Sequence, residues 1–262
     1  MFSKMKTGTK ILVGFGVAIV VTLLVALVGY HGISRVSSHL SEVGHVRLPS
    51  VLGLEKMLVG QFEAGYGVRG LLVERYADAQ TRARQYTRIE SGLKRADEGR
   101  KMYEPLPQTP EEAVMWREFV PKWEAWTESM HKLVKLSQQK DNLIAQGLSH
   151  DDPKVKAVLD ATFEEAQKNR DLMNTASAKL SDLVKLNVNV ADDALAGAER
   201  DAANAMTYAV AALLIGVVMM LAFGLWISSS ISTVLRKLVG QTKQLTEAAV
   251  QGKLDTRGDV QT

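Results

Sequence analysis

Two long runs of hydrophobic residues stand out from a chain whose remaining hydrophobic positions recur with helical spacing. Residues 11–30 contain no charged side chain, and residues 209–227 are all apolar. A helix of about 20 apolar residues crosses the hydrocarbon core of a bilayer. The pattern therefore predicts transmembrane helices at residues 11–30 and 206–230. A cleaved signal peptide is the alternative for the first run, but the run is longer than a usual signal sequence, and no convincing pair of small residues follows it.

Basic residues flank both runs on the side away from the segment that joins them. They are Lys4, Lys6 and Lys10 before the first run, and Arg236, Lys237 and Lys243 after the second. Basic residues close to the ends of membrane helices stay in the cytoplasm. Residues 1–10 and 231–262 are therefore predicted to be cytoplasmic and residues 31–205 to lie outside. Tyr30 and Tyr208 agree with this, because amphipathic rings prefer the membrane interface.

Prolines and capping residues divide the outer segment into helices. The breaks predict helices at about residues 31–75, 78–103, 110–146 and 153–205. Thr109 can cap a helix, Pro110 suits its first position, and Glu112 can complete a capping box. Asp152 before Pro153 repeats this arrangement. The first and last of the four helices are expected to run on into the two membrane helices.

Two stripes of residues predict how these helices pack. The helix at 153–205 alternates spacings of four and three through Val155, Leu159, Thr162, Ala166, Asn169, Met173, Ala176, Leu180, Leu183, Asn187, Val190 and Ala194. The helix at 110–146 carries a mainly aromatic stripe of Trp116, Phe119, Trp123, Trp126, Met130 and Leu133. Both stripes are typical of a coiled coil or bundle core, so the prediction is an all-α, antiparallel four-helix bundle at residues 31–205. Pro49 and Pro121 are expected to kink their helices.

Charge and motifs exclude several classes of function. The outer segment balances 24 Lys and Arg against 26 Asp and Glu, so it has no basic surface suited to nucleic acid. The chain has no glycine-rich phosphate loop, metal-ligand spacing or nucleophile motif. We therefore expect no enzymatic activity, no cofactor and no metal.

Small residues recur at every fourth position of the first membrane helix. They are Gly14, Ala18, Thr22 and Ala26. Small residues at this spacing let helices approach closely within lipid. The stripe is interpreted as the seam of a homodimer, with chance as the alternative, because small residues are common in membrane helices.

Several stretches resemble the methyl-accepting chemotaxis protein family with a four-helix-bundle sensor domain. They are Val28-Gly29-Tyr30-His31-Gly32-Ile33, Leu48-Pro49-Ser50-Val51 and Trp116-Arg117-Glu118-Phe119-Val120-Pro121-Lys122-Trp123. Residues 231–262 resemble the opening helix and connector of a HAMP linker, with Gly252 and Leu254 in the connector. Val234 stands where many such linkers have a proline. Residues 231–262 would then be a partial HAMP coiled coil.

The resemblance implies a homodimeric receptor in a bacterial inner membrane. Its periplasmic bundle would bind a small solute, and a displacement of the last helix would reach HAMP and a cytoplasmic signalling module or kinase complex not contained in this chain. Two alternatives remain: the input module of a sensor histidine kinase or cyclase, and a structural membrane coiled coil without a ligand.

Three arginines are the candidate ligand-binding residues. Arg69 and Arg75 lie towards the membrane-distal end of the first predicted outer helix, and Arg170 is placed at the same end on the fourth. A guanidinium group can grip a carboxylate at two points, so an amino acid or organic acid is the expected ligand class. The alternative is that these arginines only pair with neighbouring carboxylates.

Overall fold

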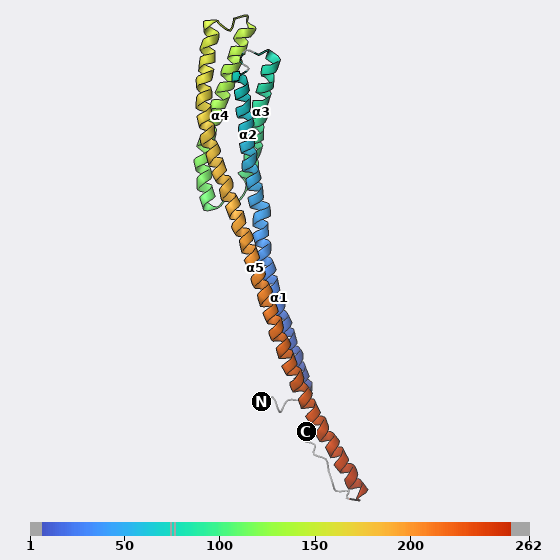
Figure 1. Ribbon diagram of the computed structural model, residues 1–262. Helices are drawn as coiled ribbons and strands as arrows, with labels where there is room; N and C mark the ends of the chain where they lie inside the picture. The colour runs from blue at the N-terminus through green and yellow to red at the C-terminus, as the bar shows by residue number, and fades with distance from the viewer. Residues whose placement is uncertain (1–6, 74, 76, 253–262) are drawn as a thin grey trace. The chain divides into compact units, whose positions relative to one another are not determined.

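The computed structural model describes residues 7–73, 75 and 77–252, and every regular element within these ranges is helical. In chain order the elements are α1 (Thr7–Glu42), the π-helical turn η2 (Val43–Arg47), α2 (Leu48–Val73), α3 (Ala79–Tyr103), α4 (Pro110–Ala145) and α5 (Pro153–Val250) (Figure 1). The predicted all-α fold is confirmed, and the predicted breaks between the outer helices agree closely with the observed ones.

The chain divides into two compact units. One unit is Ser38–Ala198, and the other combines Met1–Ser37 with Glu199–Thr262. α5 is one helix of 98 residues that contributes to both units. The N-terminal side behaves in the same way, since Gly8–Val73 is one helical stretch. Both long helices therefore continue from the bundle into the apolar segments, as the sequence predicted.

The two stripes predicted from the sequence form the core of the bundle in Ser38–Ala198. The stripe of α4 is buried along its length: Trp116, Phe119, Trp123, Trp126, Met130 and Leu133. Its rings contact one another in order, with Trp123 and Trp126 centroids 4.7 Å apart. From the seam of α5 the buried residues include Val155, Thr162, Ala166, Asn169, Ala176, Leu180, Leu183 and Asn187. Both stripes are thus bundle core, as predicted.

Glycines bring α2 and α3 unusually close together. A Cβ atom on Gly60 would lie 2.4 Å from the carbonyl oxygen of Gly92, and one on Gly99 would lie 2.5 Å from that of Gly53. No side chain fits at such separations, so only glycine lets the two backbones touch. α2 and α3 therefore form a hairpin whose spacing depends on the absence of side chains at the contact.

Local capping explains where the bundle helices begin. The hydroxyl of Thr109 accepts a hydrogen bond from the Glu112 amide at 3.1 Å, and the Thr109 amide donates to the Glu112 carboxylate at 3.2 Å. This confirms the predicted capping box, with Pro110 at the start of α4. Asp78 caps α3 by accepting from the Thr81 amide at 2.9 Å, a cap that was not predicted from the sequence.

The two prolines inside the predicted helices lie in different surroundings. Pro49 follows η2, in which the Leu48 amide donates to the carbonyl of Val43, five residues earlier. Proline lacks the amide that would continue the α-helical ladder, and a π-turn is one way to accommodate that loss. At Pro121 α4 stays helical on both sides.

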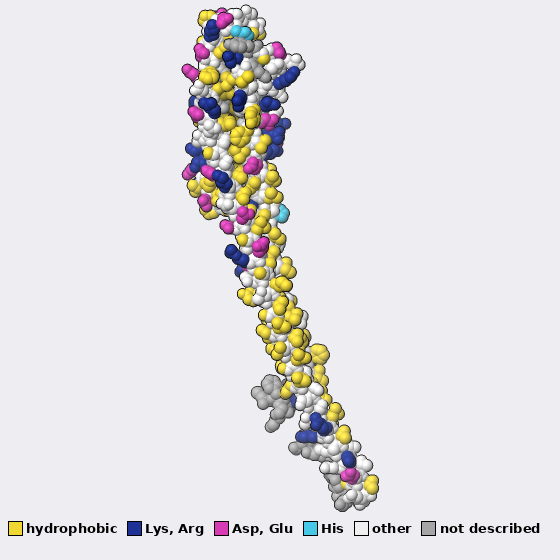
Figure 2. Space-filling model, in the orientation of Figure 1, with side chains coloured by type: hydrophobic (Ala, Val, Ile, Leu, Met, Phe, Trp, Pro, Cys, Tyr) yellow, Lys and Arg dark blue, Asp and Glu magenta, His cyan; other side chains and the backbone are white. Residues whose placement is uncertain are grey.

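In the second unit, α1 packs against the C-terminal part of α5 through small residues. A Cβ on Gly216 would lie 2.4 Å from Val21, and one on Gly14 would lie 3.0 Å from Ile227. Apolar side chains cover the outside of both segments (Figure 2). Both helices are long and apolar enough to cross a membrane, and only 6% of each apolar window is buried. A core helix of a soluble protein would be mostly covered by its own chain.

Candidate functional site

A groove of about 710 Å³ lies between α2 and α5 on the outside of the bundle. It brings together two of the three candidate arginines, Arg69 and Arg170. The other lining residues are Phe62, Gly65, Tyr66, Val68, Leu72, Phe163, Ala166, Gln167, Asn169 and Met173. The groove is therefore mostly apolar, with two cations from different helices.

The two arginines are exposed, and neither has an acidic partner in the described part of the chain. Arg69 and Arg170 form neither an ion pair nor a hydrogen bond with any residue that the structure describes. Exposed aromatic rings stand beside them: Phe62 is 45% exposed, Tyr66 62% and Phe163 57%. Guanidinium groups stack on aromatic faces and bind carboxylates through two parallel hydrogen bonds. The groove thus offers an anion site next to an apolar surface.

Arg75 does not join this site. It lies beyond the end of α2, is exposed, and donates from Nη1 to the carbonyl oxygen of Leu72 at 3.4 Å. It is absent from the residues that line the groove. The structure therefore pairs Arg69 with Arg170 and leaves Arg75 outside.

The aromatic wall of the groove belongs to an apolar stripe that was not predicted from the sequence. The stripe lies on the exposed side of α2 and comprises Leu48, Leu52, Val59, Phe62, Tyr66 and Val73, which are 45% to 73% exposed. Its spacings are multiples or combinations of three and four, so it forms a second face beside the one that enters the core. The same spacing of three and four is present in the sequence, so an analysis of both faces of this helix could have predicted the exposed stripe.

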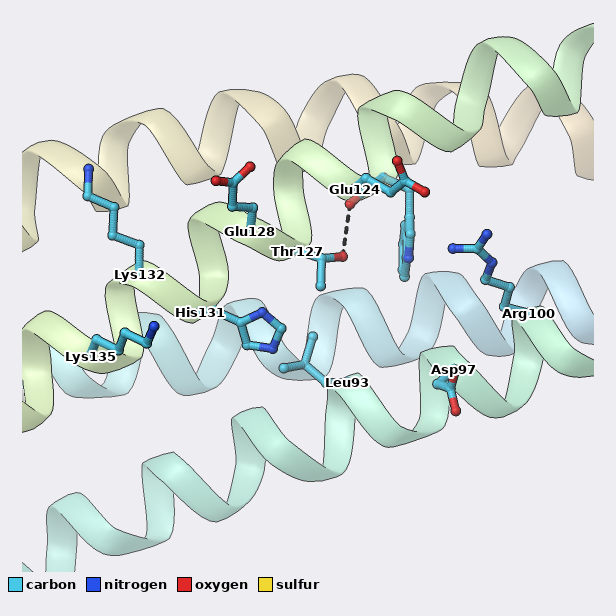
Figure 3. Close-up of a pocket in the computed structure, with 10 residues that line it drawn as sticks. Leu93, Asp97, Arg100, Glu124, Thr127, Glu128, His131, Lys132 and Lys135 are labelled. Carbon is cyan, nitrogen blue, oxygen red and sulfur yellow. Dashed lines mark hydrogen bonds between the residues drawn. The ribbon is translucent and has the colours of Figure 1, made fainter.

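A second groove, of about 730 Å³, lies between α3 and α4 (Figure 3). Its apolar and neutral lining includes Leu93, Trp123, Thr127 and His131. Charged residues of both signs surround them: Asp97, Arg100, Glu124, Glu128, Lys132 and Lys135. Several of these are already paired, since Lys132 contacts Glu165 at 2.5 Å and Arg100 contacts Glu104 at 2.8 Å. This groove has the mixed charge of a solvated helix surface and contains none of the candidate ligand residues.

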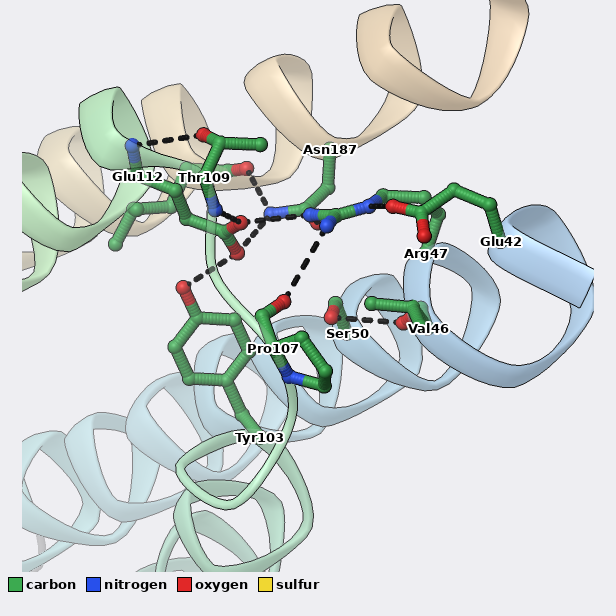
Figure 4. A network of polar contacts seen from close by, with 10 residues as sticks. Glu42, Val46, Arg47, Ser50, Tyr103, Pro107, Thr109, Glu112 and Asn187 are labelled. Atoms are coloured by element: carbon green, nitrogen blue, oxygen red, sulfur yellow. Dashed lines mark hydrogen bonds and ion pairs between the residues drawn. The ribbon is translucent and has the colours of Figure 1, made fainter. Parts of the chain in front are cut away.

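A buried polar network centres on Arg47 in η2 (Figure 4). The side chain is 3% exposed. It donates to Glu42 at 2.8 Å, to Glu112 at 2.7 Å, to Asn187 at 2.9 Å and to the Pro107 carbonyl at 3.3 Å. Burial by itself lowers the pKa of Arg47, but the hydrogen bonds to the two carboxylates outweigh it and raise the pKa. Arg47 therefore stays charged inside the bundle.

The carboxylate of Glu112 accepts the other hydrogen bonds of this network. Its carboxylate accepts hydrogen bonds from the Tyr103 hydroxyl and from the Asn187 amide, each at 2.7 Å. Burial, and then the hydrogen bond to Glu112, raise the pKa of Tyr103 far above its usual range. The network joins η2, the turn before α4 and the Asn187 position of α5. A polar position in the α5 heptad seam thus fixes where these segments meet.

A second buried cluster ties the C-terminal end of α2 to α3 and α4. Arg82 donates to Asp141 at 2.6 Å and to the Leu71 carbonyl at 3.0 Å. Asp141 also accepts from Tyr86 at 2.6 Å and pairs with Lys140 at 2.6 Å. Burial tends to raise the pKa of Asp141, but its bonds to Lys140, Tyr86 and Arg82 prevail and lower it.

The four residues of the predicted membrane seam have different surroundings in the structure. Gly14 and Ala18 line a groove against the second apolar segment of the same chain, whereas Thr22 and Ala26 are exposed. Steps of four residues turn 40° beyond a full helical turn, so the stripe spirals around α1.

Gly252 follows the end of α5 with a left-handed φ of 72°, a conformation usual for glycine at helix ends. Leu254 lies outside the described residues.

These features define a class of protein: a helical sensory bundle continuous with two apolar helices. A family model described as a four-helix bundle sensory module for signal transduction matches residues 4–200. The chain belongs to this family, the sensory modules of chemotaxis receptors. No curated protein and no solved structure matches it. The family match includes the first apolar segment as well as the bundle.

Proposed function

We propose that this chain is the input half of a methyl-accepting chemotaxis receptor in a bacterial inner membrane. Its bundle lies in the periplasm and binds a small carboxylate, an amino acid or an organic acid, in the groove between α2 and α5. It acts by binding rather than by catalysis. The observation that carries this proposal is the pair Arg69 and Arg170, which line one groove and have no acidic partner among the described residues.

The ligand class follows from the side chains of the groove. A bound carboxylate supplies hydrogen-bond acceptors, which the two guanidinium groups lack among the residues that the structure describes. The exposed rings of Tyr66 and Phe163 give its organic part an apolar surface to cover. Hydrogen bonds to charged groups contribute about 1.5–3 kcal/mol each, which is enough for one arginine to change affinity about tenfold.

The relay follows from the continuity of α5. This helix carries Arg170 and runs without a break to the apolar residues 209–227 and on to Val250. The glycine contact holds α2 to α3, so a ligand that bridges α2 and α5 pulls α5 against a rigid hairpin. A shift of an ångström or two is typical of helix-based switches. The proposal is that such a shift crosses the membrane and resets a HAMP linker that begins at residue 231 and has Gly252 and Leu254 in its connector.

A second copy of the chain is the proposed partner. The exposed apolar residues of α2 form a continuous stripe. Single exposed hydrophobic residues are normal on a protein surface, whereas a continuous apolar patch marks an interaction site. A homodimer that pairs the α2 faces would cover this stripe and place the ligand groove next to the interface. The seam Gly14, Ala18, Thr22 and Ala26 is the proposed contact in the membrane, with Thr22 and Ala26 the members left exposed by the chain itself.

The test uses the full chain in lipid nanodiscs. A thermal-shift screen against amino acids and organic acids identifies a ligand, and calorimetric titration gives its affinity. We expect Arg69→Ala and Arg170→Ala each to weaken binding about tenfold, while the control Arg75→Ala binds like the parent. Equal affinities for all variants, with unchanged melting temperatures, would contradict the site. If no compound raises the melting temperature, the ligand-free coiled coil becomes the better description.

The type of output is decided by a separate measurement. The same input half serves a chemotaxis receptor, a sensor histidine kinase or a cyclase. Fusion of residues 1–262 to a chemoreceptor signalling domain should give ligand-dependent control of its kinase if the proposal holds. Control obtained only with a histidine-kinase output domain would favour the alternative.

A further inference from the structure

A groove of about 510 Å³ lies between α1 and α5 at the outer ends of the two apolar segments. Its lining changes from apolar to polar along its length. Leu27 and Val28 belong to the apolar run, and Tyr208 stands at the edge of the second run. Beyond them the lining residues are His31, Gly32, Arg35, Asp201, Asn204 and Ala205. One end of the groove is therefore suited to hydrocarbon and the other to polar groups.

The two helices that form this groove approach each other closely beside it. A Cβ atom on Gly32 would lie 2.2 Å from the Cβ of Ala205, so α1 and α5 touch where both residues are small. The larger side chains on either side of this contact cannot enter it. They stand around it and leave a hollow between Arg35, Tyr208 and Leu27.

The charges at the polar end are arranged as a loose pair. Nη1 of Arg35 lies 3.7 Å from Oδ1 of Asp201, and the Arg35 side chain is 61% exposed against 23% for Asp201. An ion pair this long and exposed contributes little by itself. The exposed Arg35 guanidinium can donate to an anion, and the Asp201 carboxylate lies beside it. His31, Asn204 and Tyr208 add further polar groups around the two charges.

We propose that this groove binds a phospholipid whose headgroup carries a primary ammonium, such as phosphatidylethanolamine. The lipid phosphate accepts hydrogen bonds from Arg35, the ammonium donates to Asp201, and an acyl chain lies along Leu27 and Val28. This inference rests on the membrane insertion proposed above, which places residues 11–30 and 206–230 in the bilayer. A free phosphate would use only the polar end of the groove and leave its apolar end uncovered.

The chemistry of the headgroup gives the proposal its specificity. A primary ammonium has three N–H donors for the Asp201 carboxylate, whereas a choline group has none and a glycerol group has no charge. An exposed ion pair such as Arg35 with a lipid phosphate contributes up to about 1 kcal/mol, which corresponds to about a fivefold change in affinity. Arg35 should therefore govern lipid retention, and Asp201 should govern the choice of headgroup.

Native mass spectrometry of the full chain tests this. The chain is reconstituted in bilayers with equal amounts of phosphatidylethanolamine, phosphatidylglycerol and phosphatidylcholine. It is then released from the bilayer, and the mass of the chain with its bound lipids is measured. We expect the parent to retain phosphatidylethanolamine above the others. Arg35→Gln should lower lipid retention up to about fivefold. Asp201→Asn should keep bound lipid but lose the preference for the ethanolamine headgroup.

The matched control is Arg200→Gln. Arg200 is exposed, lies next to Asp201 in the chain, and does not line the groove, so its replacement should leave lipid retention at the parent level. Equal retention in the parent and in Arg35→Gln would overturn the proposal. Displacement of the lipid by excess inorganic phosphate would also overturn it, because the site would then recognise a free anion.

Two further measurements test whether a second chain fills the groove and whether the chain enters the membrane at all. Efficient disulfide crosslinking between copies carrying Asn204→Cys would show that a second chain covers the groove, which would overturn the lipid site. Carbonate extraction of membranes tests insertion on its own. If the chain resists extraction and shows no headgroup preference, only the lipid proposal fails. If carbonate releases the chain, the membrane receptor proposed above fails as well.

Discussion

Glu112 shows how much one buried carboxylate can connect. It pairs with Arg47, accepts from Tyr103 and Asn187, and caps the start of α4 through Thr109. Its neighbour Glu111 lies in the same first turn but is exposed. The difference between the two residues comes from which face of α4 enters the bundle.

Replacement of Glu112 should therefore be far more harmful than replacement of Glu111. Removing one partner of a buried ion pair leaves an uncompensated charge and costs about 3–5 kcal/mol. We expect Glu112→Ala to lower the melting temperature of the bundle strongly and Glu111→Ala to change it little. Tryptophan fluorescence follows the transition, because Trp116, Trp123 and Trp126 lie in the core. Similar losses for both variants would contradict the buried network as a source of stability.

The Asp141 cluster predicts how stability depends on pH. The folded state lowers the pKa of Asp141 through Lys140, Tyr86 and Arg82. A carboxyl with a depressed pKa stabilises the fold above its unfolded pKa, and this stabilisation is lost as the pH falls through the folded value. The parent should lose stability as the pH is lowered below about 4.

The variant Asp141→Asn isolates this contribution. It cannot titrate, so its melting temperature should fall less between neutral and acidic pH than that of the parent. At neutral pH the variant should be the less stable of the two, because Arg82 and Lys140 are buried and lose their carboxylate partner. Parallel pH profiles for parent and variant would remove Asp141 as a source of the acid dependence.

At the scale of elements, the α2–α3 hairpin depends on glycine rather than on large side chains. Gly60 and Gly92 let two helix backbones touch, and Gly53 and Gly99 repeat the contact two helical turns away. α5 differs, because it meets the bundle core through side chains such as Leu180 and Leu183. The contact of α2 with α3 is therefore set by backbone atoms, and the contact of α5 with the core is set by side chains.

A single methyl group should disturb this hairpin. Gly60→Ala places a Cβ 2.4 Å from a backbone oxygen, so α2 and α3 must separate, and overpacking of this kind costs about 1–3 kcal/mol. Gly44→Ala is the control, since a Cβ there would meet nothing within 4 Å. It should be neutral or slightly stabilising, because alanine favours helix over glycine. Urea unfolding of both variants gives the comparison, and equal midpoints would contradict the tight contact.

At the scale of the whole molecule, topology is the property that the proposed function most requires. The basic residues that flank the two apolar runs predict that both termini are cytoplasmic. A reporter enzyme that is active only in the periplasm should be active when fused at Gln108, in the turn before α4, and inactive when fused after Thr262. The reverse pattern would overturn the proposed orientation and the periplasmic ligand site together.

Local patterns in the sequence determined the helices, the core stripes and the apolar segments. Helical periodicity, proline breaks and the Thr109 capping box act over a few residues, so they can be read directly from the chain. The stripe from Trp116 to Leu133 was predicted and is buried, and so are most positions of the α5 seam. The resemblance found in these motifs agrees with the family match over residues 4–200.

Only the tertiary structure decided which distant residues meet. Arg69 and Arg170 share a groove, Arg75 does not, and Arg47 joins Glu112 and Asn187 across the bundle. The glycine contact of α2 with α3 was equally invisible in the sequence, because glycine gives no periodic hydrophobic signal. Such contacts between distant residues depend on the rotation and register of the packed helices. No spacing along one helix encodes those quantities, since they arise from how all the helices of the bundle fit against each other.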